Sequence, residues 1–179
     1  MPSLALLSIL CRDRVGLVSA VADHLFGIGV NLGDATFAVL GGGAEFTAVC
    51  ELPEGVAPPD LEAGLRSIPE LDGAQVQAVP YTFDPDAGPL GRITHRIEVA
   101  GGDQLGLIAR LAEIFTRYGA NIVRLEAQKL PAAQGSRYVT RFAVSIPPEQ
   151  ADICLASVAN TAGSLGLESR AEAVADDRS

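Results

Sequence analysis

An aspartate, a glycine and an asparagine recur at the same spacing in two stretches of the chain. The first set is Asp13, Gly16 and Asn31, and the second set, 90 residues later, is Asp103, Gly106 and Asn121. Carboxylate and amide oxygens accept hydrogen bonds from an ammonium group. Backbone N–H groups at the start of a helix bind a carboxylate, which the helix dipole favours. Together these residue types suit a free amino acid as ligand.

The same residues also have a purely structural interpretation. Asp13 and Asp103 are residues that cap helices, and the two asparagines are residues that hold tight turns. Glycine permits such turns without any ligand. The sequence leaves both interpretations open.

The two stretches are copies of one unit. Residues 13–31 align with residues 103–121 without a gap, and most of the non-identical pairs exchange one apolar residue for another. A repeat of this kind governs the prediction of the fold. The identical pairs are Asp13/Asp103, Gly16/Gly106, Leu17/Leu107, Ala22/Ala112, Gly29/Gly119 and Asn31/Asn121.

Hydrophobic periodicity predicts the same order of elements in each copy. The expected strands are 3–11, 31–39, 44–52 and 74–83, then 93–100, 121–130, 138–146 and 166–174. The expected helices are 16–28, 61–68, 106–118 and 148–162. Asp60 is placed as a helix N-cap. The first strand is apolar on both alternations, which predicts that both of its faces are covered.

The order β-α-β-β-α-β occurs twice and predicts an α+β protein with two ferredoxin-like units. Right-handed crossovers give each unit an antiparallel sheet with both helices on one face. We expect domains at 1–83 and 92–179, joined by a linker at 84–91 that is rich in proline, glycine and aspartate. Charges on one alternation of the second-half strands predict a helix-free face, solvated or facing a partner. These residues are Arg96, Glu98, Arg124, Glu126, Arg137 and Arg141.

Composition narrows the function classes. The 179 residues carry a formal net charge of −9, which repels nucleic-acid phosphates, and no helix-turn-helix or basic arm is present. The apolar run 4–10 is too short to span a bilayer and lacks a basic region before it. We therefore expect a cytoplasmic protein without direct nucleic-acid or membrane binding.

Enzymatic motifs are missing from the sequence. It contains no GxSxG, phosphate-binding loop, HExxH or dinucleotide fingerprint. Cys11 stands where a nucleophile would, but no histidine lies near it in sequence. The three cysteines and two histidines form no metal-ligand spacing, so we expect buried thiols, no metal, no cofactor and no catalysis.

The duplicated loop Asp-x-x-Gly-Leu, followed by a helix that ends in Gly-x-Asn, resembles ACT domains over nearly the whole chain. Tandem proteins of this size resemble the glycine cleavage system transcriptional repressor group. The resemblance implies side-by-side pairing of domains and an amino acid bound between two of them. The implied ligand residues are Asp13, Arg14, Val15, Gly16, Leu17 and Asn31 in the first copy and Asp103, Gln104, Leu105, Gly106, Leu107 and Asn121 in the second.

Two features depart from the family pattern. The family loop often has proline before the glycine, where this chain has Val15 and Leu105. The second copy has Gln104 where the first has Arg14, which could contact a carboxylate. We therefore expect the first copy to bind better.

The resemblance implies a non-enzymatic regulator that binds an amino acid and controls a partner protein, with transcriptional control of glycine metabolism as one form. We expect a homodimer because edge strands expose unpaired backbone groups. The alternative is an ACT-type dimerisation module with degenerate sites. Ligand-dependent melting distinguishes the two.

Overall fold

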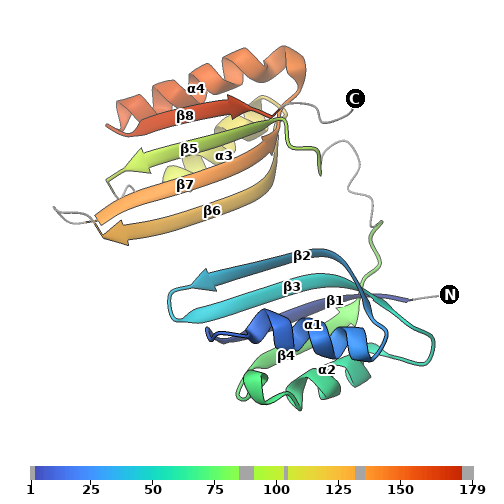
Figure 1. Cartoon of the computed structure of the whole chain (residues 1–179). Coiled ribbons are helices and arrows are strands. Elements are labelled where there is room, and N and C mark those ends of the chain that lie inside the picture. Colours follow the sequence, from blue (N-terminus) through green and yellow to red (C-terminus); the bar gives the residue numbers. More distant parts are fainter. Residues whose placement is uncertain (1–2, 85–90, 103–104, 132–135, 175–179) are drawn as a thin grey trace. The chain divides into compact units, whose positions relative to one another are not determined.

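The computed structural model describes residues 3–84, 91–102, 105–131 and 136–174 (Figure 1). The chain divides into two compact units, Met1–Asp84 (unit 1) and Pro85–Ser179 (unit 2). The predicted linker 84–91 includes residues 85–90, which lie outside the described residues.

Unit 1 is a four-stranded antiparallel sheet with two helices. The strand order is β2-β3-β1-β4, so β2 and β4 are the edges. Its elements are β1 (Ser3–Arg12), α1 (Leu17–Gly27), β2 (Asn31–Leu40), β3 (Gly43–Leu52), α2 (Pro58–Arg66), the 3-10 turn η1 (Pro69–Leu71) and β4 (Gln75–Pro80).

Unit 2 repeats this topology with the order β6-β7-β5-β8, which confirms the predicted pair of ferredoxin-like units. Its elements are β5 (His95–Gly101), α3 (Leu107–Arg117), β6 (Asn121–Pro131), β7 (Ser136–Ser145), the 3-10 turn η3 (Pro148–Gln150), α4 (Ala151–Ser164) and β8 (Glu168–Ala173).

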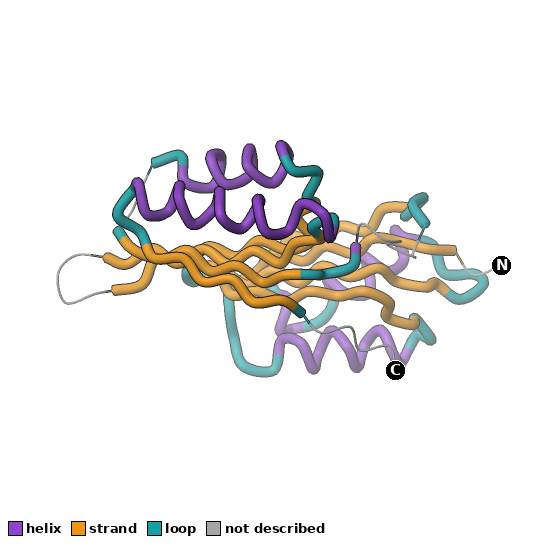
Figure 2. Tube along the Cα trace, turned by 90° about the horizontal axis from the view of Figure 1, so that it is seen from above, coloured by secondary structure: helices purple, strands orange, loops and turns teal. Residues whose placement is uncertain are grey.

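The core of each unit lies between one sheet face and its two helices (Figure 2). In unit 1 the buried alternation of β1 packs with a buried stripe on α1. These side chains are Ala5, Leu7 and Ile9 on the strand and Leu17, Val21 and Leu25 on the helix. Burying one such leucine contributes about 1.5–3 kcal/mol. In unit 2 the rings of Phe115 and Phe142 meet edge to face, with centroids 5.2 Å apart.

The prediction that both faces of the first strand are covered is wrong within unit 1. The alternation that points away from the helices is only partly buried, and Leu10 on it is 47% exposed. The helices cover one face only, so apolar residues on the other face have no layer of the same unit above them.

Asp60 is not the N-cap that the sequence indicated. Helix α2 begins at Pro58, three residues before the predicted start, and Ala57 is its N-cap. Asp60 lies in the first turn, where its Oδ2 accepts a hydrogen bond from the Ala57 N–H at 3.0 Å. Prolines are tolerated in a first turn because the N–H they lack has no helical partner there. Strand β4 is also shorter than predicted and ends at Pro80.

The internal repeat has the same backbone in both units. Gly16 and Gly106 have φ of +88° and +78°, and each is the N-cap of its helix. Helices α1 and α3 both have 11 residues, and Asn31 and Asn121 each begin the following strand. This backbone needs glycine at positions 16 and 106, since other L-residues rarely adopt positive φ.

Candidate ligand-binding loops

The loop before α1 is hydrogen-bonded to the hairpin turn between β2 and β3. Asp13 follows β1 directly, and its N–H donates a hydrogen bond to the Gly42 carbonyl at 3.2 Å. No side chain caps α1. The capping interpretation of Asp13 is therefore wrong, and the N–H groups of the first turn of α1 lack helical acceptors.

Side chains on this loop divide into an anchor and exposed groups. Leu17 is buried in the core and fixes the first turn of α1. Asp13, Arg14 and Val15 are exposed, and Val15 is exposed as fully as in an extended chain. A small molecule would therefore find a carboxylate, a guanidinium and an aliphatic group at the surface.

Asn31 lies at the first position of β2 and pairs across the sheet with Glu51 of β3. Its Nδ2 donates a hydrogen bond to Glu51 Oε2 at 3.1 Å, so it does not hold a turn. That bond orients the amide, and its oxygen remains able to accept from an ammonium group. Sequence reasoning missed Glu51. Its place in the alternation of the expected strand 44–52 was visible in the sequence. The register between that strand and β2 was not, so the sequence could not place Glu51 opposite Asn31.

The structure does not bring Asn31 to the loop of its own unit. Asn31 is level with Glu51, and Glu51 is level with Leu4 at the start of β1. Asp13 lies beyond the other end of β1. Nine residues of strand place the two side chains roughly 30 Å apart. Asp13 and Asn31 of one unit are therefore too far apart to contact the same small ligand.

The second loop has the same outline. Leu105 is fully exposed, Gly106 has positive φ, and Leu107 is buried at the start of α3. Asp103 and Gln104 lie outside the described residues. Asn121 begins β6 and is paired in register with Ser145, where unit 1 has Glu51. At the register position where unit 1 has a carboxylate, unit 2 therefore has a serine.

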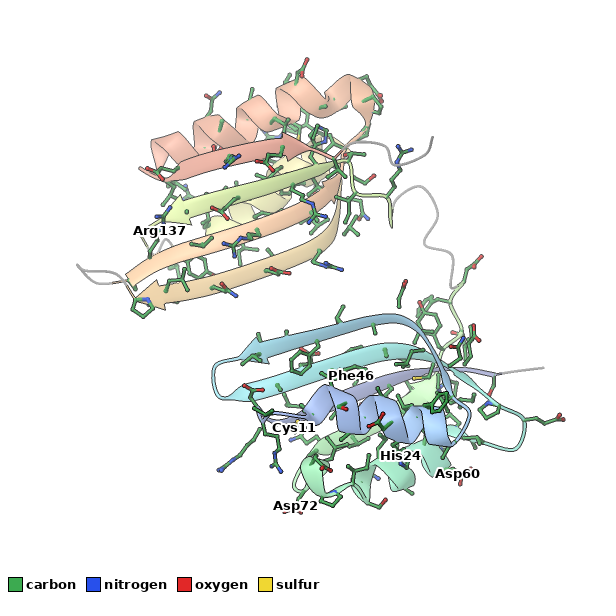
Figure 3. The ribbon with its side chains drawn as sticks, in the orientation of Figure 1. Cys11, His24, Phe46, Asp60, Asp72 and Arg137 are labelled. Atoms are coloured by element: carbon green, nitrogen blue, oxygen red, sulfur yellow. The ribbon has the colours of Figure 1, made fainter. Side chains whose placement is uncertain are left out.

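Cys11, the nearest thiol to the loop, is poorly suited to nucleophilic chemistry. Burial raises the pKa of its thiol, Arg14 lowers it less, and Asp13 raises it further. The thiol therefore stays protonated at neutral pH, and the thiolate is the reactive form. Its Sγ lies 4.0 Å from the Ala44 carbonyl oxygen (Figure 3). The described residues contain no cluster of groups that could hold a metal ion.

The two edges of the unit 1 sheet differ. Glu62 Oε1 accepts a hydrogen bond from the Ala78 N–H at 2.8 Å, and Arg66 Nη2 donates to the Val76 carbonyl at 2.5 Å. Glu62 and Arg66 also form an ion pair at 2.9 Å. Side chains of α2 therefore occupy backbone groups of edge strand β4. Edge strand β2 pairs only with β3 among the described strands.

The duplicated sheet-and-helix unit with its glycine-capped loop has a tandem ACT-like fold. The chain is structurally similar to a protein from Galdieria sulphuraria described as unknown, with 22% identity, a TM-score of 0.76, and 98% of this chain and 100% of that one covered. A protein provisionally named glycine cleavage system transcriptional repressor matches at 14% identity and a TM-score of 0.68, over 98% and 99% of the two chains. No protein-family model and no curated protein matches the sequence.

None of the helices in the described part of the chain combines the length and the apolar character that a bilayer crossing requires.

Proposed function

We propose that this protein is a non-enzymatic regulator that binds a free amino acid at the loop before α1. The observation that carries this is the exposed loop of unit 1, where Gly16 begins a helix that no side chain caps, next to Asp13 and Arg14. The N–H groups of the helix and the Arg14 guanidinium suit the ligand carboxylate. The name of one structural relative, a transcriptional repressor, supports a regulatory role.

The ammonium partner in this proposal comes from a second copy of the chain. Asn31 with Glu51 supplies an amide oxygen and a carboxylate, but both lie at the far end of the sheet from the loop. Antiparallel pairing of two β2 edges would bring Asn31 of one copy to the Leu40 end of the other. Asp13 lies at that end, through its bond to Gly42. A homodimer thereby completes two equivalent sites.

The edge that would pair is β2. Strand β4 already has backbone groups bonded by Glu62 and Arg66. Natural proteins protect edge strands in this way against pairing with another chain. Strand β2 has ten residues and is exposed along nearly its whole length, which suits the dimerisation that we propose.

Unit 1 is the stronger site in this proposal. It has Arg14 and Glu51 where unit 2 has Gln104 and Ser145. Unit 2 therefore lacks the positive charge that would face the ligand carboxylate and the negative charge that would face the ligand ammonium group at these two positions. With its amino acid bound, this protein would act on another protein, because its negative net charge disfavours direct contact with nucleic acid.

A thermal-shift screen over the twenty amino acids tests ligand binding. At a hundredfold excess over its dissociation constant, a ligand of the native state stabilises it by about 2.7 kcal/mol. That corresponds to a rise in melting temperature of roughly 2–5 °C. If none of the twenty raises the melting temperature, the module with degenerate sites replaces this proposal.

A further inference from the structure

The sheet face of unit 2 that carries no helix has a hollow lined by charged side chains. Its volume is about 280 Å³, and residues from all four strands of this sheet line it. The predicted charged alternation is confirmed here, and β8 adds an arginine that the prediction did not include. The arginines of the hollow are Arg96, Arg124, Arg141 and Arg170.

Two of the four arginines are already paired. Arg141 Nε donates to Glu98 Oε2 at 2.8 Å, across the β5–β7 pair. Arg170 Nη2 lies 2.5 Å from Glu172 Oε1 on the same strand. Their charges are compensated locally, so they contribute little net field to the hollow.

Arg96 and Arg124 have no ion pair among the described residues. Both are in register with Ala143, from opposite sides: Arg96 on β5 and Arg124 on β6. Two strand spacings put their Cα atoms about 10 Å apart. Ala143 lies on the strand between them and lines the hollow together with both arginines. Glu172 is opposite Arg96 on β8 but is held by Arg170.

We propose that this hollow binds a compact anion whose oxyanion group is shared by Arg96 and Arg124. Guanidinium groups present planar pairs of N–H donors that match carboxylate and phosphate oxygens. Two such groups over a small residue can hold one anion from both sides. The site lies on the sheet face of unit 2 and is separate from the loop before α3.

The surrounding charges favour a small anion over a nucleic acid. Glu98, Glu126 and Glu172 also line the hollow and alternate with the arginines along and across the strands. An extended phosphate backbone would meet these carboxylates as well as the net charge of −9 of the chain. A compact anion above Ala143 meets the guanidinium groups of Arg96 and Arg124. Of the three carboxylates, only Glu126, which is level with Arg141, has no ion pair among the described residues.

The test is calorimetric titration of the full chain with two probes, inorganic phosphate and succinate, at low ionic strength with chloride as the filling salt. We expect one site per chain for at least one probe. Tighter binding of phosphate would identify a phosphorylated ligand, and tighter binding of succinate would identify a dicarboxylate. Arg96→Gln and Arg124→Gln should each weaken binding at least tenfold, and Arg96→Lys should weaken it because the planar fork is lost.

Arg137→Gln is the matched control. Arg137 is on the same sheet face at the start of β7, is half exposed, and pairs with Glu168 at 3.6 Å outside the hollow (Figure 3). Its loss removes the same charge without touching the site, so affinity should stay within about twofold. All variants should keep the amino-acid response of the first loop.

Three results would overturn the proposal. One is the absence of heat with both probes up to about ten millimolar. Another is an equal loss of affinity in Arg137→Gln and Arg96→Gln, which would mean diffuse electrostatic attraction. The third is unchanged affinity in the double variant Arg96→Gln, Arg124→Gln. Circular dichroism of each variant separates loss of binding from loss of fold.

Discussion

The hydroxyl of Thr140 lies in the core of unit 2 without a hydrogen-bond partner among the described residues. The predicted charged alternation put Arg137 and Arg141 on one face of β7, and the structure confirms it, with Thr140 and Phe142 on the other face. The sequence could not show that the hydroxyl is unpartnered, because its neighbours come from β5 and β6. For a single residue, the sequence predicts the sheet face on which its side chain lies, but not the hydrogen-bond partner of that side chain.

Thr140→Val should stabilise the protein by about 1 kcal/mol, because valine keeps the shape and removes an unpaired polar group. Urea denaturation measures the change. Thr140→Ser keeps the hydroxyl and loses a methyl group, so it should destabilise. Lower stability of the valine variant would show that the hydroxyl has a partner in solution.

The carboxylate of Glu62 makes the stability of the fold depend on pH in the acidic range. The hydrogen bond from the Ala78 N–H lowers its pKa most, burial raises it, and Arg66 lowers it. Because the folded pKa lies below the unfolded one, Glu62 stabilises the fold above the unfolded pKa. This contribution is lost as pH falls through the folded pKa. Glu62→Gln should therefore flatten the loss of stability between pH 7 and about pH 3, measured by urea denaturation. An unchanged pH profile would contradict this.

Among the elements, α1 and α2 were predicted from periodicity, but their contact was not. His24 on α1 lies against Gly64 on α2, and its Nε2 is buried without a partner among the described residues (Figure 3). A Cβ on Gly64 would lie 2.6 Å from that nitrogen. Periodicity places a glycine on a helix, but only the packing of two helices explains why it is small.

Gly64→Ala should destabilise unit 1 by about 1–3 kcal/mol through overpacking. The opposite sign is expected for an unhindered helical glycine, where alanine gains about 1 kcal/mol. Gly163→Ala in α4 is the control, since nothing lies within 4 Å of its added Cβ. The second variant His24→Ala should remove most of the Gly64→Ala penalty in a double-mutant cycle. Equal stabilisation by both alanines would contradict the packing.

For the whole molecule, the duplication and the fold were predictable because they depend on pattern. The sequence could not predict which of the candidate residues lie close enough together to share one ligand. The loop before α1 and Asn31 are near in sequence, but helix α1 carries the chain back along the sheet, so the two lie at opposite ends of the strands. That separation is the reason for placing the site between two copies of the chain.

Sedimentation should show a dimer at micromolar concentration. Phe37→Lys, on exposed edge strand β2, should shift the protein towards monomer because a lysine on an edge strand opposes pairing with another chain. Val79→Lys, a similarly exposed position on β4, should leave the dimer intact. A monomeric wild type, or equal effects of the two lysines, would contradict pairing through β2.

The isolated protein should not bind duplex DNA tightly at physiological salt, because its charge of −9 repels the phosphates. A sequence-specific gel shift with pure protein would show the opposite.

A complementation titration tests the shared site most directly. Asp13→Ala and Asn31→Ala chains are each titrated with the amino acid that raises melting most, then mixed in equal amounts after exchange of subunits. We predict weak or no binding by each variant alone. The mixture should recover about a quarter of the wild-type sites, because half of the dimers are mixed and each holds one intact site. Full binding by either variant alone, or no recovery in the mixture, would contradict a site built from two copies of the chain.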